Sequence, residues 1–176
     1  MSAEHLSPSA QEAGEELAGL FSEDQSDRTS WPMDQIDIEA VMARDAARLE
    51  RVKEMCRGQA LRTGADYYHA AMILQHAHEP EDYLLAHELC VVAIGKGEER
   101  AKWLAAASED RYLASIGRPQ RFGTQYHTDD GGKSWYLYQV DPDFSDDLRR
   151  AFNVPPLSGA RAHLERMNAN PAPSVA

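Results

Sequence analysis

The sequence predicts an all-α protein: a compact multi-helix domain with a repeat-like antiparallel helical hairpin and one small β-hairpin. Apolar residues recur every three or four positions over much of residues 34–115, which is the spacing of a buried helix face. Glycine and proline divide these segments from one another. A later segment, residues 123–140, is instead rich in β-forming residues. We therefore expect about five to seven helices and a single hairpin of strands.

The first helices follow from this spacing. A short helix is expected over residues 11–21, and Ser30-Trp31-Pro32 breaks the chain after it. A long helix should begin at Asp34, a suitable N-cap, and end near Arg57, before Gly58. The next helix, residues 66–78, has almost no polar face, so it should lie at the centre of the domain, enclosed by the others.

Two further helices, residues 80–95 and 98–115, are separated by Gly95-Lys96-Gly97. Their small and apolar residues recur at a spacing that lets two antiparallel helices approach closely. The spacing resembles one unit of the tetratricopeptide or Sel1-like repeats. A solenoid normally needs about three such units, so we expect a single repeat-like hairpin. The residues of this pattern are Ala86, Ala93, Gly97, Ala101, Leu104 and Ala105.

After Gly117 the composition changes. Two β-rich segments flank the turn signal Asp129-Asp130-Gly131-Gly132, which predicts a β-hairpin near residues 123–140. Two short helices should close the domain, over residues 145–152 and 157–167. Residues 1–9 and 169–176 have the composition of flexible tails, which leaves residues 10–168 as one domain.

Composition narrows the function classes. The net charge of the 176 residues is −11, and no patch of Lys and Arg with interleaved aromatics is present, so we expect no nucleic-acid partner. No membrane-spanning segment and no secretory signal is expected, which indicates a cytoplasmic protein. Cys56 and Cys90 lie in apolar helical patterns and should be core thiols; a disulfide or redox pair is the alternative.

Four polar residues occupy positions where the helical spacing calls for apolar ones: Asp45, Gln75, His76 and Asp110. Burying an unpaired carboxylate is costly, so each aspartate should have a cation or several donors, with Arg48 and Arg111 as nearby candidates. Three interpretations remain open. The set could be a structural network that fixes helix register, a functional pocket, or a solvated face that the periodicity misassigns.

Several short motifs resemble a bacterial family of unknown function, domain of unknown function 6624. They are Glu23-Asp24-Gln25 with Arg28, Gln75-His76, Asp110-Arg111, and the stretch from Gly117 to Gln125, which ends in Gly123-Thr124-Gln125. The resemblance covers most of residues 20–165. Arg118 stands where that family usually has Lys, and Phe122 where it usually has Tyr. The resemblance implies a shared fold and a shared site, and it implies no activity.

Together these features predict an intracellular enzyme or small-molecule binder with a polar pocket and a small anionic ligand. His76 would be the general acid or base, with Asp110 and Arg111 beside it, and the arginines would hold a carboxylate or phosphate. The alternative is a non-catalytic helical module that binds a partner peptide in an apolar groove floored by Tyr67, Tyr68 or Trp103. The residues expected to contact the ligand are Asp24, Gln25, Arg28, Asp45, Gln75, Gln120, Thr124 and Gln125.

No metal or cofactor is expected. His76 and His78 have a plausible metal spacing, but two ligands on one helix are better placed four residues apart, and His69 is seven residues from His76. No carboxylate or Cys cluster completes a set. The loop 117–123 could bind an anion through its backbone or could be a plain turn between helix and strand. Gly117 and Pro119 should turn the chain back after Arg111, so that Asp110 and Arg111 contact Gln120 or Gln125.

Overall fold

The computed structural model describes residues 10–29 and 38–169. Within them the chain forms seven helices and one two-stranded antiparallel sheet, as predicted for the fold class. The expected breaker Ser30-Trp31-Pro32, the expected N-cap Asp34 and the two expected tails up to residue 9 and from residue 170 lie outside the described residues. The elements are α1 (Ala10–Thr29), α2 (Ile38–Arg57), α3 (Gly64–Leu74), α4 (Pro80–Gly95), α5 (Ala101–Ser115), β1 (Tyr126–His127), β2 (Tyr136–Leu137), α6 (Asp146–Ala151) and α7 (Leu157–Ala169).

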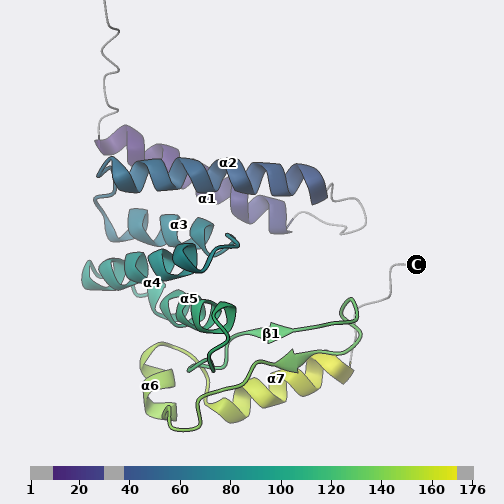
Figure 1. Ribbon diagram of the computed structural model, residues 1–176. Helices are drawn as coiled ribbons and strands as arrows, with labels where there is room; N and C mark the ends of the chain where they lie inside the picture. Colours follow the sequence, from purple (N-terminus) through teal and green to yellow (C-terminus); the bar gives the residue numbers. More distant parts are fainter. Residues whose placement is uncertain (1–9, 30–37, 170–176) are drawn as a thin grey trace, which may run out of the picture.

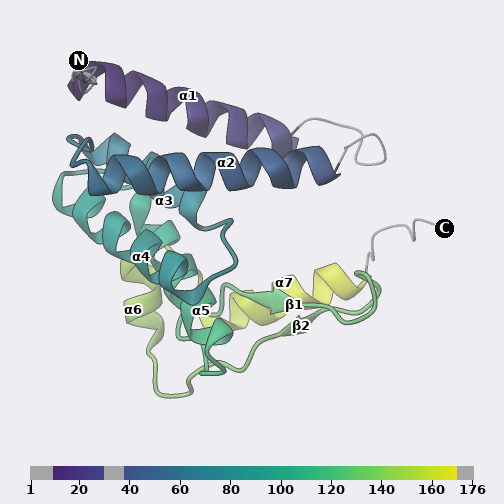
Figure 2. The same ribbon diagram turned by 45° about the horizontal axis from the view of Figure 1, so that its top comes forward.

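The helices form a stack (Figures 1 and 2). The long helices α1 and α2 lie side by side at one end and both contact α3. Helix α4 packs between α3 and α5. The sheet, α6 and α7 form the other end, where α7 packs along β2.

The core runs through the stack from α1 to α5. Helix α3 is enclosed as expected: Ala70, Ala71 and Leu74 are fully buried. All the alanines of the repeat-like pattern on α4 and α5 are also fully buried, and His87 Nδ1 of α4 lies 2.9 Å from the carbonyl oxygen of Ala105 on α5. Small side chains therefore let α4 and α5 pack closely. Both cysteines are free thiols, and burial raises the pKa of Cys90 to about 12.

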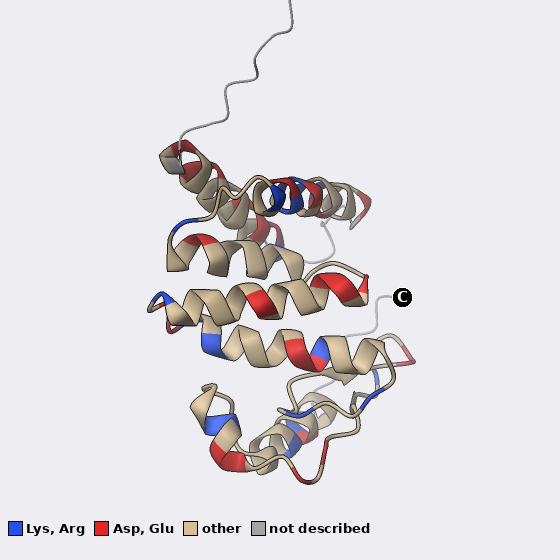
Figure 3. Cartoon of the chain, turned by 60° about the vertical axis from the view of Figure 1, so that its left-hand side comes forward, with Lys and Arg blue, Asp and Glu red and all other residues tan. Residues whose placement is uncertain are grey.

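Charged side chains are distributed unevenly along the stack (Figure 3). Helix α2 carries acidic and basic residues along its length, whereas α3 carries only one charged residue, Asp66. Asp66 and Thr63 form a capping box, in which each side chain accepts a backbone N–H of the other residue. This cap starts α3 at Gly64, two residues before the predicted start at Asp66.

The predicted first helix is wrong in length, because α1 continues from Phe21 to Thr29. Its apolar pattern ends at Phe21, and its last turns are held to α2 by ion pairs instead: Asp27 with Arg44 and Arg48, and Arg28 with Asp45. The apolar stripe predicted for α2 also fails from its first turns to its middle, where Met42 is 58% exposed and Arg48 is buried. Ion pairs, and not apolar side chains, join α1 to α2 in this part of the interface.

The third predicted helix ends too late, since α3 stops at Leu74 and not at His78. Gln75, His76 and Ala77 form a turn after the helix, with N–H groups bonded to Ala71, Ile73 and Leu74. The hydroxyl of Tyr83 on α4 donates to the carbonyl of Ala77 at 2.6 Å and holds this turn. The turn places Gln75 and His76 at the edge of the core.

The chain leaves α5 sharply at Gly117, as predicted. Gly117 has φ +70°, and Arg118 N–H donates to the carbonyl of Leu113, which closes the helix end. The sheet is shorter than the expected hairpin: only Tyr126–Leu137 and His127–Tyr136 pair in the antiparallel ladder. A separate, parallel bridge joins Gln120 to Val140 outside this ladder. Among the described helices, none is both long and apolar enough to cross a bilayer.

Candidate functional site

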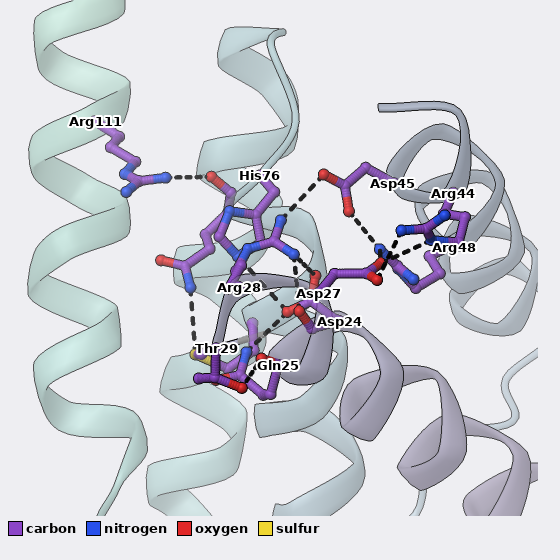
Figure 4. A network of polar contacts seen from close by, with 12 residues as sticks. Asp24, Gln25, Asp27, Arg28, Thr29, Arg44, Asp45, Arg48, His76 and Arg111 are labelled. Atoms are coloured by element: carbon purple, nitrogen blue, oxygen red, sulfur yellow. Dashed lines mark hydrogen bonds and ion pairs between the residues drawn. The ribbon is translucent and has the colours of Figure 1, made fainter. Parts of the chain in front are cut away.

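The structure brings most of the predicted polar residues to one region, where the ends of α1 and α3 meet α2 and α5 (Figure 4). Asp24, Gln25 and Arg28 come from α1, Asp45 from α2, and Arg111 from α5. Gln75 and His76 lie in the turn after α3. Arg111 approaches this turn from one side, and Arg28 and Asp24 approach it from the other.

Asp24 is the buried acid of this region, with 1% of its surface exposed. Gln25 Nε2 donates to Oδ2 at 2.8 Å, and Arg28 Nη1 lies 2.8 Å from Oδ1. The well-directed hydrogen bond of Arg28 Nη1 goes to the carbonyl oxygen of Asp24, so Oδ1 has an ion pair but no hydrogen bond. Burial raises the pKa of Asp24 against the opposing effect of Arg28.

Asp45 lies in an ion-pair network and is only partly buried, contrary to the prediction from its helix stripe. Arg48 Nη2 contacts Asp45 Oδ1 at 2.7 Å, which confirms the expected pair. Arg28 Nη2 contacts the other Asp45 oxygen at 3.1 Å. Asp27 completes the network through Arg44 and Arg48, and the hydrogen bond from Arg44 lowers the pKa of Asp27 to about 2. This network joins α1 to α2.

His76 lies between Arg28 and Arg111, and its imidazole is neutral at pH 7. Its Nε2 atom is buried, has no hydrogen bond and lies 3.7 Å from Asp24 Oδ2. Burial first, and then the positive charges of Arg28 and Arg111, lower the pKa of His76 to about 3. A neutral imidazole with so low a pKa is a weak base at pH 7.

Asp110 is fully buried, and four hydrogen bonds occupy its carboxylate. Oδ1 accepts the N–H groups of Arg121 and Phe122, at 2.7 and 3.0 Å. Oδ2 accepts the N–H and the hydroxyl of Thr124, at 3.0 and 2.8 Å. The suggestion that Arg111 is the partner of Asp110 is wrong, because loop donors take that place. The geometry gives Asp110 the task of holding the loop.

Gln120 is also fully buried and satisfied within the loop. Its Nε2 donates to the carbonyls of Gln125 and Tyr138, both at 3.0 Å, and its Oε1 accepts from the N–H of Gln125 at 2.9 Å. Gln120 and Thr124 are therefore built into the scaffold of the loop by these bonds and by those of Asp110. They fix the position of Gln125.

Arg111 differs from the other arginines of the region. Its guanidinium Nε donates to Gln125 Oε1 at 3.1 Å, and Nη1 donates to the carbonyl oxygen of Gln75. It has no Asp or Glu within 4.0 Å among the described residues, unlike Arg28, Arg48 and Arg44. Burial lowers its pKa, and the positive charge of Arg28 lowers it further. Arg111 is a desolvated cation that the protein itself does not neutralise.

A pocket of about 290 Å³ opens beside Arg111 and Gln125. Its wall contains the aromatic residues Tyr83, Tyr126 and Tyr138. Asp110 is not part of the lining. Both Asp110 and Arg111 contact the loop, as predicted, but they contact different sides of it. Asp110 belongs to a sealed cluster, and Arg111 and Gln125 face open space.

Some residues that support this pocket lie outside the sequence motifs, and the sequence did not point to them. Arg149 of α6, which is buried, donates through Nη2 to the carbonyl of Arg121 at 2.7 Å and through Nε to that of Phe122 at 3.2 Å. It clamps the loop from the side opposite Asp110. Its segment is rich in charged residues, so no pattern marked it as buried. The pocket tyrosines gave no signal either, since each lies in an ordinary helix or strand pattern.

No arrangement of three or more His, Cys, Asp or Glu side chains that could hold a metal ion occurs in the described parts of the chain. Comparisons with protein-family models, with curated proteins and with solved structures find no match for this chain. The resemblance to domain of unknown function 6624 and that to helical repeats therefore stay predictions. The geometry of the site is thus the basis on which a function can be proposed.

Proposed function

We propose that the chain binds a small molecule through a carboxylate or phosphate group in the pocket beside Arg111. The observation that carries this proposal is the guanidinium of Arg111, which lines the pocket and has no acidic partner among the described residues. Even a partly buried cation such as Arg111 is unfavourable without an acidic partner. A bound anion would remove that cost, and the planar fork of arginine suits carboxylate and phosphate oxygens.

The neighbouring groups fit such a ligand. Gln125 is held in place by Gln120, and its amide already contacts Arg111, so both present fixed polar groups to the pocket. Tyr83, Tyr126 and Tyr138 supply flat apolar walls. The net charge of −11 does not oppose the proposal, because charges more than about 10 Å away are largely screened at physiological salt.

Binding is better supported than catalysis. His76 would be the general acid or base of an enzyme, but its pKa of about 3 leaves little basicity at neutral pH. Part of that low pKa comes from Arg28 and Arg111, so an anion at Arg111 would raise it. His76 is then the residue to examine for chemistry once a ligand is known.

The alternative, a module that binds a peptide, has weaker support. It expects Tyr67, Tyr68 or Trp103 at the floor of an apolar groove. Lys96 lies over the ring of Tyr67 and Arg100 over that of Tyr68, so both rings are already covered. Trp103 lines a cavity, but small side chains and a cation line the same space.

Thermal-shift titration tests the proposal. The full chain is titrated at constant ionic strength with phosphate, malate, citrate and, as a neutral control, glycerol. We expect a saturable rise in Tm with at least one of the anions and none with glycerol. Arg111→Gln should weaken anion binding about 10- to 100-fold, the usual effect of losing charge-assisted hydrogen bonds.

Arg118→Gln is the matched control, because it removes the same charge from an exposed residue that does not line the pocket. Arg111 also holds Gln75 and Gln125, so a second variant, Tyr138→Ala, removes one aromatic wall of the pocket and leaves the contacts of Arg111 in place. It should weaken binding about 3- to 10-fold. The proposal fails if no anion raises the Tm of the native chain, or if Arg111→Gln binds as the native chain does.

A further inference from the structure

We infer that a second site, separate from the Arg111 pocket, takes a small aromatic or otherwise apolar acid. The site is a cavity of about 470 Å³ bounded by α5, the segment 123–126 and α7. This volume lies within the range of about 300–1,000 Å³ that is usual for small-molecule sites. Of the residues predicted for a site or groove, Thr124 and Trp103 line this cavity.

One side of the cavity is apolar and aromatic. Trp103 of α5 lines it and leaves 47% of its surface exposed. Val154 and Pro155 continue this side. A ligand ring that stacks on Trp103 would cover apolar surface that the chain leaves uncovered.

Small residues on α7 leave the cavity open. Gly159, Ala162, His163 and Arg166 lie on one face of that helix, three or four residues apart, and all line the cavity. Ala162 leaves room where a larger side chain would fill it. A Cβ on Gly159 would lie 3.0 Å from Pro155 Cβ, so a larger residue there would crowd the wall of the cavity.

The same face supplies a positive charge. Arg166 has no Asp or Glu within 4.0 Å in the described part of the chain. Its charge acts on Tyr126, opposing the rise that burial causes in the pKa of that phenol. The ring of His163 lies edge-on to Tyr126, with 5.4 Å between the centroids, and Tyr126 donates its hydroxyl to the carbonyl of Ala160 at 3.1 Å. A cation beside fixed aromatic walls is complementary to an acid with an apolar body.

The two pockets can be tested independently. Tyr126 lines both, but Arg111 lines only the smaller pocket, and Ala162 and Arg166 line only the larger one. A variant at Ala162 or Arg166 therefore reports on the second site and leaves the polar groups of the first site in place.

The test is a fluorescence titration of the full chain with two probes. One is 8-anilinonaphthalene-1-sulfonate, an aromatic anion, and the other is N-phenyl-1-naphthylamine, which has a similar ring system without the acid. We expect saturable binding of both, with the anion bound more tightly. Ala162→Phe should abolish binding of both probes by filling the cavity, whereas Ala169→Phe, on the same helix outside the cavity, should not.

Arg166→Gln should weaken the anionic probe about three- to fivefold, since Arg166 is exposed and its ion pair is partly screened. It should leave the neutral probe unchanged. Arg161→Gln, which removes the same charge from the same helix outside the cavity, is the control. Circular dichroism confirms folding, and Ala162→Leu replaces Ala162→Phe if the latter does not fold.

Three results would overturn the inference. They are absence of saturable binding to the native chain, unchanged binding after the cavity is filled, and an equal loss of both probes in Arg166→Gln. The last result would mean that the cavity does not select an acid.

Discussion

Two adjacent residues of α5, Asp110 and Arg111, have separate tasks. Consecutive positions on a helix point about 100° apart, so their side chains leave the helix in different directions. Asp110 enters the sealed cluster and accepts the N–H groups of residues 121, 122 and 124. Arg111 reaches Gln125 and the carbonyl of Gln75 at the pocket. The motif Asp110-Arg111 thus joins a structural residue to a candidate ligand contact.

Asp110→Asn should destabilise the fold by about 3 kcal/mol, because an amide cannot accept the hydrogen bonds that both carboxylate oxygens receive. Urea unfolding measures the change. The control is the neighbouring Glu109→Gln, which breaks only an ion pair with the exposed Arg121 and should cost less than about 1 kcal/mol. Similar losses in the two variants would argue against the role given to Asp110.

His76 should make stability depend on pH. Its pKa falls from 6.5 in the unfolded chain to about 3 in the fold, so between these values the unfolded chain binds more protons. Stability is then lost as the pH falls below 6.5, by up to about 2 kcal/mol at pH 5 relative to pH 7.5. The raised pKa of Asp24 acts in the opposite direction in native and variant chains alike.

Denaturant unfolding of the native chain and of His76→Gln at pH 7.5 and pH 5 isolates this contribution. The variant should lose less stability on acidification than the native chain does. Equal losses in both chains would show that His76 titrates normally in the fold.

At the scale of elements, the loop from α5 to β1 carries the site. Gly117 ends the helix, Asp110 and Arg149 hold the loop from two sides, and Gly123 allows its final turn with φ +81°. A Cβ on Gly123 would make only ordinary contacts, at 3.5 Å from Ala160 and Leu157. Its backbone conformation, and not crowding, is therefore what requires glycine there.

Gly123→Ala should cost about 1–2 kcal/mol from the left-handed conformation and should also weaken anion binding, because Gln125 is two residues away. Gly131→Ala is the matched control, with φ +72° and open space around it, in the turn between β1 and β2. It should cost about the same stability and leave anion binding intact. Thermal melts with and without phosphate measure both effects, and equal binding in the two variants would contradict the account.

The sequence predicted the helices wherever apolar spacing continued, and it failed where polar contacts replaced that spacing. The end of α1 from residue 22 to Thr29 has no apolar side and is held by Asp27 and Arg28, so periodicity could not find it. The end of α3 depends on Tyr83 of the next helix, which bonds the turn at Ala77. Both depend on polar contacts with a neighbouring helix, which apolar spacing within one helix does not reveal.

At the scale of the whole molecule, the candidate site lies where the helical stack meets the C-terminal part with the sheet. Arg111 joins the two, through Gln75 after α3 and Gln125 before β1. Polar residues on expected apolar faces predicted Gln75, His76 and Asp110 as one group, with Arg111 added as a nearby cation. The same reasoning could not separate Asp110 and Gln120, which are structural, from Arg111, because burial and hydrogen-bond partners come only from the fold.

The central claim is that Arg111 binds an anion, and NMR of the arginine side chains tests it most directly. The Nε–H resonance of Arg111 is assigned as the signal lost in Arg111→Lys and followed during a titration with phosphate and citrate at constant ionic strength. We predict a saturable shift of that resonance and of the Gln125 side-chain amide, with the resonance of Arg118 unchanged. An Arg111 resonance that stays constant throughout, or that shifts only linearly together with exposed arginines, would contradict the claim.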